Sequence, residues 1–154
     1  MELPKKTKLQ KKIKDLIQKN ANAVHFIGPI SEKDIQGIEA SLGVALPKDY
    51  QWFLRTYGHG GCFGLEIEGG SLNGATPRVV EETKRNREVG LPQHLITIAN
   101  CDEYICCLDT SKMKNGVCPV VGCEFDGGDF LFQEDSFLEY FYQELLDHQE
   151  NWYS

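Results

Sequence analysis

The chain has 154 residues, of which 41% are hydrophobic and 25% charged, and its formal net charge is −7. These values are typical of one soluble globular domain and argue against a disordered tail. No segment approaches about 18 consecutive apolar residues, and no apolar stretch follows the basic start, so we expect a cytoplasmic protein without a membrane span.

The charge is divided unevenly along the chain. Residues 1–20 carry seven lysines against Glu2 and Asp15, a balance of +5. The remaining nine basic and 21 acidic residues give residues 21–154 a charge of −12. Such an acidic body repels nucleic acid phosphates and attracts basic protein surfaces. We therefore expect a basic protein partner and no direct contact with nucleic acid or a membrane.

The first predicted element is an amphipathic helix over residues 8–19. Its apolar stripe is formed by Leu9, Ile13, Leu16 and Ile17, with lysines on the other faces. The stripe has no aromatic anchor, which favours a helix docked on the domain over a membrane or nucleic acid contact. A brief extended segment is expected at residues 24–27. Residues 1–29, the helix and its connection, are assigned to the same domain as residues 30–154.

Two helices joined by a corner are predicted between residues 30 and 61. Ser31, with Asp34 three positions later, is an acidic variant of the N-terminal capping pattern, and Gly43 supplies a C-cap. Pro47 suits the first turn of the second helix. The stripe of that helix consists of Tyr50, Phe53, Leu54 and Tyr57, and a glycine turn at residues 58–61 ends it.

The middle of the chain is predicted to be rich in strands. Residues 63–68 alternate apolar and acidic side chains, the pattern of a half-buried strand. A charged helix is expected over residues 78–88, opened by Pro77 and closed by Gly90. Further strands are predicted at residues 95–99, 104–108, 117–122 and 130–133.

The last predicted helix begins after Ser136, with Glu139 completing its capping box, and runs to about residue 150. Apolar and aromatic side chains cover more than half of its circumference, so it needs partners on two sides. Packing between the sheet and another helix is the favoured interpretation. The alternative is a surface for a partner protein, including a weak homodimer.

The segment from Ile38 to Leu54 resembles the signature of the SUKH superfamily. It reads Ile-Glu-x-x-Leu-Gly-x-x-Leu-Pro-x-Asp-Tyr-x-x-Phe-Leu. Further matches follow in order at residues 107–110, 119–121 and 136–140, and the resemblance covers about residues 30–142. The chain departs from the family at the glycine turn, where many members have Asn-Gly-Gly and this chain has Tyr57-Gly58-His59-Gly60-Gly61.

This resemblance implies a fold and a range of functions. The fold is α+β, a single domain with a mostly antiparallel curved sheet flanked by helices. The order of predicted helices and strands agrees with that class independently. The superfamily includes bacterial immunity proteins, similar to antitoxins of LXG-type polymorphic toxins, and the eukaryotic Smi/Knr cell-wall regulators. The resemblance therefore implies a protein that binds another protein.

The sequence offers little evidence for an enzyme, a cofactor or a metal site. A catalytic pair of His59 and Cys62 is conceivable, but these residues flank glycines that are more simply explained by a chain reversal. The six cysteines are interpreted as reduced. Their Cys-x4-Cys spacings do not match paired zinc knuckles. Nucleotide-binding glycine motifs and an EF-hand loop are absent. We predict no catalytic residues, no metal and no cofactor.

A candidate partner surface is predicted from acidic residues on loops, interleaved with aromatic residues that could anchor a partner. Its members are Asp102, Glu103, Glu124, Phe125, Asp126, Asp129, Phe130, Glu134 and Asp135. Phe132 belongs to the same interleaved pattern. The leading hypothesis is an immunity protein that occludes the basic cleft of a toxin, which we expect to be a nuclease. A regulatory adaptor that binds a housekeeping protein is the alternative, followed by a small enzyme that uses His59 and Cys62.

Overall fold

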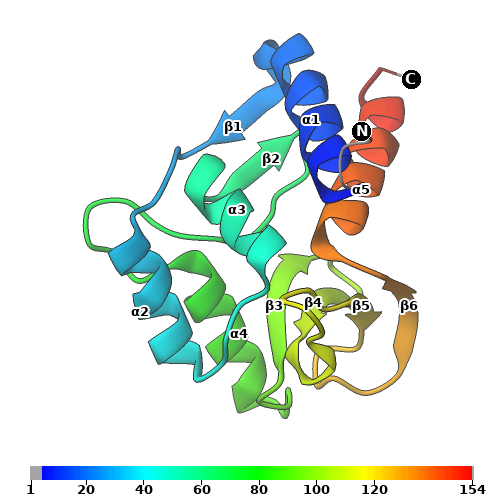
Figure 1. Ribbon diagram of the computed structural model, residues 1–154. Helices are drawn as coiled ribbons and strands as arrows, with labels where there is room; N and C mark the ends of the chain where they lie inside the picture. Colours follow the sequence, from blue (N-terminus) through cyan, green and yellow to red (C-terminus); the bar gives the residue numbers. More distant parts are fainter. Residues whose placement is uncertain (1–4, 154) are drawn as a thin grey trace.

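The computed structural model describes residues 5–153 and shows helices packed around two antiparallel sheets (Figure 1). The first four residues of the predicted N-terminal segment, with Glu2 among them, lie outside the described residues, as does residue 154. In chain order the elements are α1 Lys5–Lys19, β1 Val24–Phe26, α2 Glu32–Leu42, α3 Lys48–Thr56, β2 Gly60–Cys62, α4 Arg78–Glu88, β3 Leu95–Asn100, β4 Ile105–Asp109, β5 Val120–Cys123, β6 Phe130–Glu134 and α5 Phe137–Tyr153. Short 3-10 turns lie at Ala21–Ala23 and Thr110–Lys112. The predicted α+β class is confirmed.

The larger sheet is a meander in which β3, β4, β5 and β6 are neighbours in chain order. Ile105 of β4 lies opposite Cys123, which lies opposite Phe130, so these strand ends meet at one end of the sheet. Val120 lies opposite Glu134 at the other end. The four corresponding predicted strands are confirmed within a few residues. In the smaller sheet β1 pairs with β2.

Local signals define the ends of α2 and α5 as predicted. The Ser31 hydroxyl accepts a hydrogen bond from the Asp34 N–H at 3.1 Å, and Gly43 ends α2 in the left-handed region at φ 73°. The Ser136 hydroxyl accepts from the Glu139 N–H at 3.2 Å. Pro47 and Pro77 stand at the N-caps of α3 and α4, one position before the first turn.

The core joins α3 and α5 through aromatic rings. Phe53 is fully buried and contacts Phe137 and Phe141 edge to face, with centroid distances of 5.6 and 5.4 Å. The buried Asp49 carboxylate accepts from the Tyr50 N–H and from the Leu138 N–H, which belongs to the first turn of α5. Burial raises the Asp49 pKa, and these hydrogen bonds oppose that effect. One carboxylate therefore fixes the starts of both helices relative to each other.

Helix α1 docks on the domain as the sequence indicated. Its buried residues are Ile13 and Ile17, and it packs beside α5 (Figure 1). Lys5 forms an ion pair with Glu139 of α5.

The predicted strand over residues 63–68 is wrong. The strand is β2, Gly60–Cys62, inside the segment that was predicted to be a glycine turn. Phe63 at φ 58° and Gly64 at φ 81° turn the chain directly after it, and of the predicted strand only Ile67 forms a bridge, to Gly60. A Cβ on Gly60 would lie 1.9 Å from the His25 carbonyl oxygen, and one on Gly61 would lie 1.9 Å from that of Leu65. These glycines serve close backbone packing on two sides, which an alternation pattern does not reveal.

Candidate partner-binding groove

Two adjacent cavities lie along one face of α5 and together form what we call the acidic groove. One, of about 200 Å³, lies between α5 and β6. The other, of about 330 Å³, lies between α5, the β3–β4 turn and the segment after β2. They share Tyr140 and Glu144. The polar and aromatic side chains that line the acidic groove include Glu66, Asp102, Tyr104, Phe132, Glu134, Tyr140, Glu144, Asp147 and His148.

Helix and strand periodicities place these side chains together. Tyr140, Glu144, Asp147 and His148 follow the i, i+4, i+7, i+8 spacing that defines one face of a helix. Phe132 and Glu134 are two apart on β6 and so project from the same face of the sheet. Strand β6 leads into α5 through Asp135 and Ser136, and the two elements contact each other.

The groove is strongly acidic. Five carboxylates line it, and among the described residues no lysine or arginine does. Burial raises the pKa of Glu144, and the neighbouring Asp147 and Glu134 carboxylates raise it further, while His148 lowers it. The His148 Nε2 lies 3.7 Å from the Glu144 carboxylate. A partner cation placed here would relieve this repulsion.

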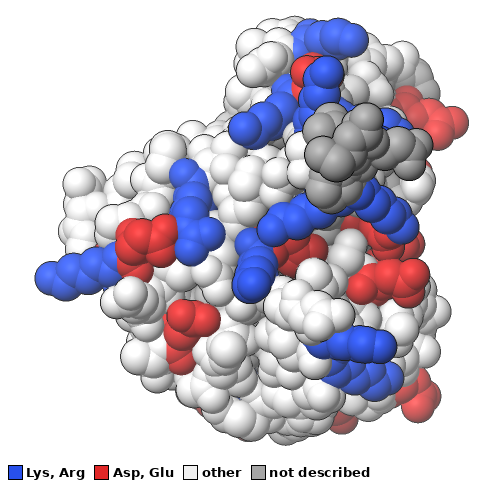
Figure 2. All heavy atoms as spheres, viewed as in Figure 1, with Lys and Arg blue, Asp and Glu red and all other residues white. Residues whose placement is uncertain are grey.

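The charge distribution over the surface differs from side to side. In Figure 2, basic side chains cover the upper part of the molecule, over α1, while several acidic side chains reach the right margin, where α5 and β6 lie. Lys5 and Lys6 of α1 lie near Asp135 at the start of α5, whereas no lysine or arginine of the described residues lines the acidic groove. A basic partner is therefore attracted to the groove more strongly than to the surface of α1.

Aromatic rings line the groove beside the carboxylates. Tyr104 and Phe132 meet edge to face with a centroid distance of 6.0 Å. The Phe132 ring crosses Gly122 of β5, where a Cβ would lie 2.2 Å from it. The Tyr140 side chain is only 1% exposed, and its hydroxyl has no hydrogen-bond partner within residues 5–153. A buried polar atom without a partner costs free energy, and the Tyr140 side chain lines both cavities.

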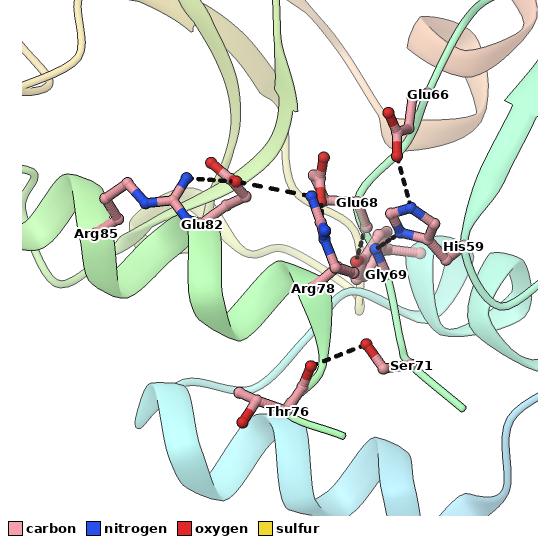
Figure 3. Close-up of polar contacts among 10 residues, drawn as sticks. His59, Glu66, Glu68, Gly69, Ser71, Thr76, Arg78, Glu82 and Arg85 are labelled. Atoms are coloured by element: carbon pink, nitrogen blue, oxygen red, sulfur yellow. Dashed lines mark hydrogen bonds and ion pairs between the residues drawn. The ribbon is translucent and has the colours of Figure 1, made fainter. Parts of the chain in front are cut away.

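The His59 and Cys62 pair of the enzyme hypothesis is not assembled. His59 Nδ1 accepts from the Gly69 N–H at 3.0 Å, so the neutral ring carries its proton on Nε2, which faces the Glu66 carboxylate at 2.8 Å (Figure 3). Both ring nitrogens are therefore occupied by groups other than Cys62. The Cys62 thiol is buried, and burial raises its pKa. A thiol in that environment is a poor nucleophile.

A second polar cluster stands beside His59 (Figure 3). Glu68 is 5% exposed, and its nearest cation is Arg78, with Nε 3.6 Å from the carboxylate. Arg85 pairs with Glu82 at 2.7 Å, and Arg78 lies 4.0 Å from Glu82. Burial, then the Glu66 carboxylate, raises the Glu68 pKa to about 7, partly offset by Arg78.

The predicted partner residues are spread over several places. Asp102 lines one cavity of the acidic groove, and Glu134 lines the other. Glu103 is exposed in the same turn as Asp102. Asp135 is exposed beside Lys5 and Lys6, in a mixed-charge region at the start of α5.

The remaining predicted residues belong to the β5–β6 loop and its ends. Glu124, Asp126 and Asp129 are exposed, and the Asp126 carboxylate accepts from the Gly128 N–H at 2.9 Å. Phe125 packs on a small apolar cluster on the opposite face of the larger sheet. Phe130 is exposed on β6. The loop acids and Glu134 are separated by the length of β6, about 13 Å for four residue steps.

Sequence reasoning missed most of the acidic groove. The alternation over residues 63–68 predicts a strand that contains Glu66, and the sequence analysis predicts no site at Glu144, Asp147 or His148. A signal was present in the last helix, where Tyr140, Glu144 and Asp147 recur at helical spacing. Their convergence with β6 and the β3–β4 turn depends on tertiary packing.

Residues 5–153 contain neither a metal cluster nor a helix able to span a membrane. No group of three or more His, Cys, Asp or Glu side chains is placed to hold a metal ion. The six cysteines are free thiols. Among these residues, no helix has the length and apolar character needed to cross a membrane.

Comparison with known families identifies the family of this chain. The family model SUKH_5, described as SMI1-KNR4 cell-wall, matches residues 9–146. The match spans α1 to the middle of α5, so it includes β6 and most of the groove-lining part of the last helix.

Proposed function

Because the chain belongs to the SUKH family of SMI1-KNR4 type, we propose that it is an immunity protein that binds a cognate polymorphic toxin and neutralises it. The family resemblance supplies the general role, binding of another protein. The observation in this structure that supports the proposal is the acidic groove. Five carboxylates and three aromatic side chains line it, and no lysine or arginine of the described residues does.

The mechanism is occlusion. Carboxylates of the groove meet lysine and arginine side chains of the toxin, while the rings of Tyr104 and Phe132 supply apolar contact beside them. The exposed loop acids Glu124, Asp126 and Asp129 extend the negative field and speed the encounter. This chain contributes no chemistry of its own.

A nuclease is the toxin class that fits this charge pattern best. The active-site cleft of a nuclease attracts phosphates with basic side chains, and carboxylates presented on a protein surface can take the place of those phosphates. An immunity protein with an acidic groove would then block the cleft against its nucleic acid substrate.

The direct test is calorimetric titration against the C-terminal domain of a large secreted protein encoded beside this one, in an inactivated form. The expected result is 1:1 binding with a dissociation constant of about 10 nM or less, close to −11 kcal/mol. Absence of binding at about 10 µM, with both proteins folded, would contradict the immunity role.

The electrostatic mechanism has its own test. The variant E144Q/D147N removes two groove charges, and E88Q removes one exposed carboxylate at the end of α4, outside the groove. At low salt we expect association of E144Q/D147N to slow about tenfold and that of E88Q to change little. Equal association rates for the groove variant and the unchanged protein would reject occlusion by this groove.

A regulatory adaptor is the second candidate. The observation that favours it is the description of the matching family, which names a cell-wall role. In that case the same groove would bind a resident protein of the cell rather than a toxin. Affinity capture with E144Q/D147N as the matched negative control distinguishes the two by the identity of the captured protein.

A further inference from the structure

Strand β6 is an open edge of the larger sheet. It pairs with β5 on one side, and no other strand of the described chain pairs with its second side. Phe130 and Leu131 are 46% and 58% exposed, values unusual for large apolar side chains on a strand. An edge of this kind presents alternate backbone N–H and C=O groups to the solvent.

Strand β6 reads Phe-Leu-Phe-Gln-Glu and contains no proline, lysine or arginine, residues that often protect an edge strand. Its register with β5 skips Leu131, since Phe132 lies opposite Gly122 and Phe130 opposite Cys123, so β6 has a bulge at Leu131. From Phe132 to Glu134 the pairing is regular, and this part of the strand offers a free edge next to the exposed Phe130 and Leu131 side chains.

The free edge borders the acidic groove. Phe132 and Glu134, from alternate positions of β6, line the cavity whose other wall is Gln143, Glu144 and Asp147 of α5. A strand added beside β6 continues the same sheet, so its alternate side chains project from the face on which the groove lies. Cationic side chains at those positions would meet the groove carboxylates.

From these observations we propose that the partner contributes an extended segment that pairs with the free edge of β6 and carries lysine or arginine at alternate positions, which enter the acidic groove. The proposal rests on the proposed function in taking a basic protein as the partner. It adds the conformation and the sequence pattern of the bound segment. The backbone hydrogen bonds supply affinity, and the groove selects the charge.

A second copy of this chain is a poor occupant of the edge. β6 carries Glu134 and is flanked by Asp129 and Asp135, so pairing two β6 strands would bring acidic residues together. Like charges directly opposite each other destabilise a strand pair. Charge complementarity therefore favours a basic segment from another protein.

The test uses a capped peptide that alternates lysine and valine, titrated into the full chain at low salt. A control peptide of the same charge has proline in place of its valines, which removes half of its backbone N–H donors and favours the polyproline II conformation over a strand. We expect saturable binding of the first peptide and binding at least about tenfold weaker for the second. Similar affinities for the two peptides, or no saturation at about 1 mM, would overturn strand pairing.

Amide hydrogen exchange supplies the structural readout. On peptide binding the outward-pointing amides in the regular part of β6, residues 132–134, should gain protection, because alternate N–H groups of an edge strand point outward. Protection confined to α5 or to the β5–β6 loop would contradict the proposal.

Matched variants test the charge preference. D147N should lower the affinity for the lysine-valine peptide about fivefold. E150Q, on the same helix but outside the groove, should leave that affinity unchanged. Equal binding by D147N and the unchanged protein would remove the groove from the proposal.

The two proposals fail separately. A neighbouring toxin that binds tightly but leaves the β6 amides unprotected keeps the immunity role and rejects strand pairing. Peptide binding at β6 without neutralisation of any neighbouring toxin keeps the strand site and rejects the immunity role.

Discussion

Substitution of Glu68 by glutamine should stabilise the protein at alkaline pH and have little effect near pH 5. Two hydrogen bonds hold the Glu68 backbone in a buried position. The Glu68 N–H donates to the Ile98 carbonyl at 2.7 Å, and the Glu68 backbone carbonyl accepts from the Tyr50 hydroxyl at 2.6 Å. One carboxylate oxygen, Oε2, has no hydrogen-bond partner within residues 5–153.

The magnitude follows from the Glu68 pKa, which rises from 4.5 to about 7 on folding. A carboxyl whose pKa is raised on folding holds its proton more tightly in the folded state. Its contribution to stability is therefore fully present below about pH 4.5 and is lost as the pH rises through about 7. Well above both values the ionised group costs about 3 kcal/mol, from roughly 1.4 kcal/mol per unit of pKa. Neutral glutamine of the same shape avoids that cost.

The assay is denaturant unfolding of E68Q and the unchanged protein at about pH 5 and about pH 8. The gain in the free energy of unfolding should be below about 1 kcal/mol at the lower pH and 2 to 3 kcal/mol larger at the higher pH. E88Q serves as the exposed control and should show no such dependence. An equal effect of E68Q at both pH values would refute the reasoning, because it would show that ionisation of Glu68 is not the cause.

Three further predictions follow from buried contacts. Gly60→Ala should lower the free energy of unfolding by about 3 kcal/mol or prevent folding, since φ is 119° and a Cβ would meet the His25 carbonyl oxygen; thermal unfolding monitored by circular dichroism measures it. Asp49→Ala should lower the free energy of unfolding by about 2 to 4 kcal/mol, because it leaves the buried N–H groups of Tyr50 and Leu138 unpaired. Asp49→Asn should recover part of that loss, and denaturant unfolding of the two variants measures the difference. The Cys62 thiol should resist a thiol-specific reagent at neutral pH in the folded protein and react on unfolding, and rapid labelling of the native state would contradict its burial.

Elements specified by short-range chemistry were predictable from the sequence. Ser31 and Gly43 bound α2 because a hydroxyl cap and a left-handed glycine act within one helical turn. The strands of the meander are apolar runs separated by turns, and the larger sheet pairs them in chain order, so their neighbours in sequence are their neighbours in space. The SUKH signature lies in the same locally determined region, the α2–α3 corner.

The strand β2 was not predictable in that way. Its three residues include two glycines, which favour turns in isolation, and the alternation after it is typical of a strand. The strand exists because β1, far earlier in the chain, supplies its hydrogen-bond partners and leaves no room for a Cβ at Gly60. Contacts between distant segments outweighed the local preference.

The acidic groove also combines features that the sequence predicts with features that depend on the fold. The sequence by itself determined that the folded body is acidic and that Asp102 and Glu134 stand at the ends of strands, because charge and turn signals are properties of single segments. Only the tertiary structure decided which carboxylates act together. Packing of α5 against the sheet brings Glu144 and Asp147 to Glu134 and separates all three from the loop acids. Electrostatic energy depends on distances in space, and for residues far apart in the chain the fold alone sets those distances.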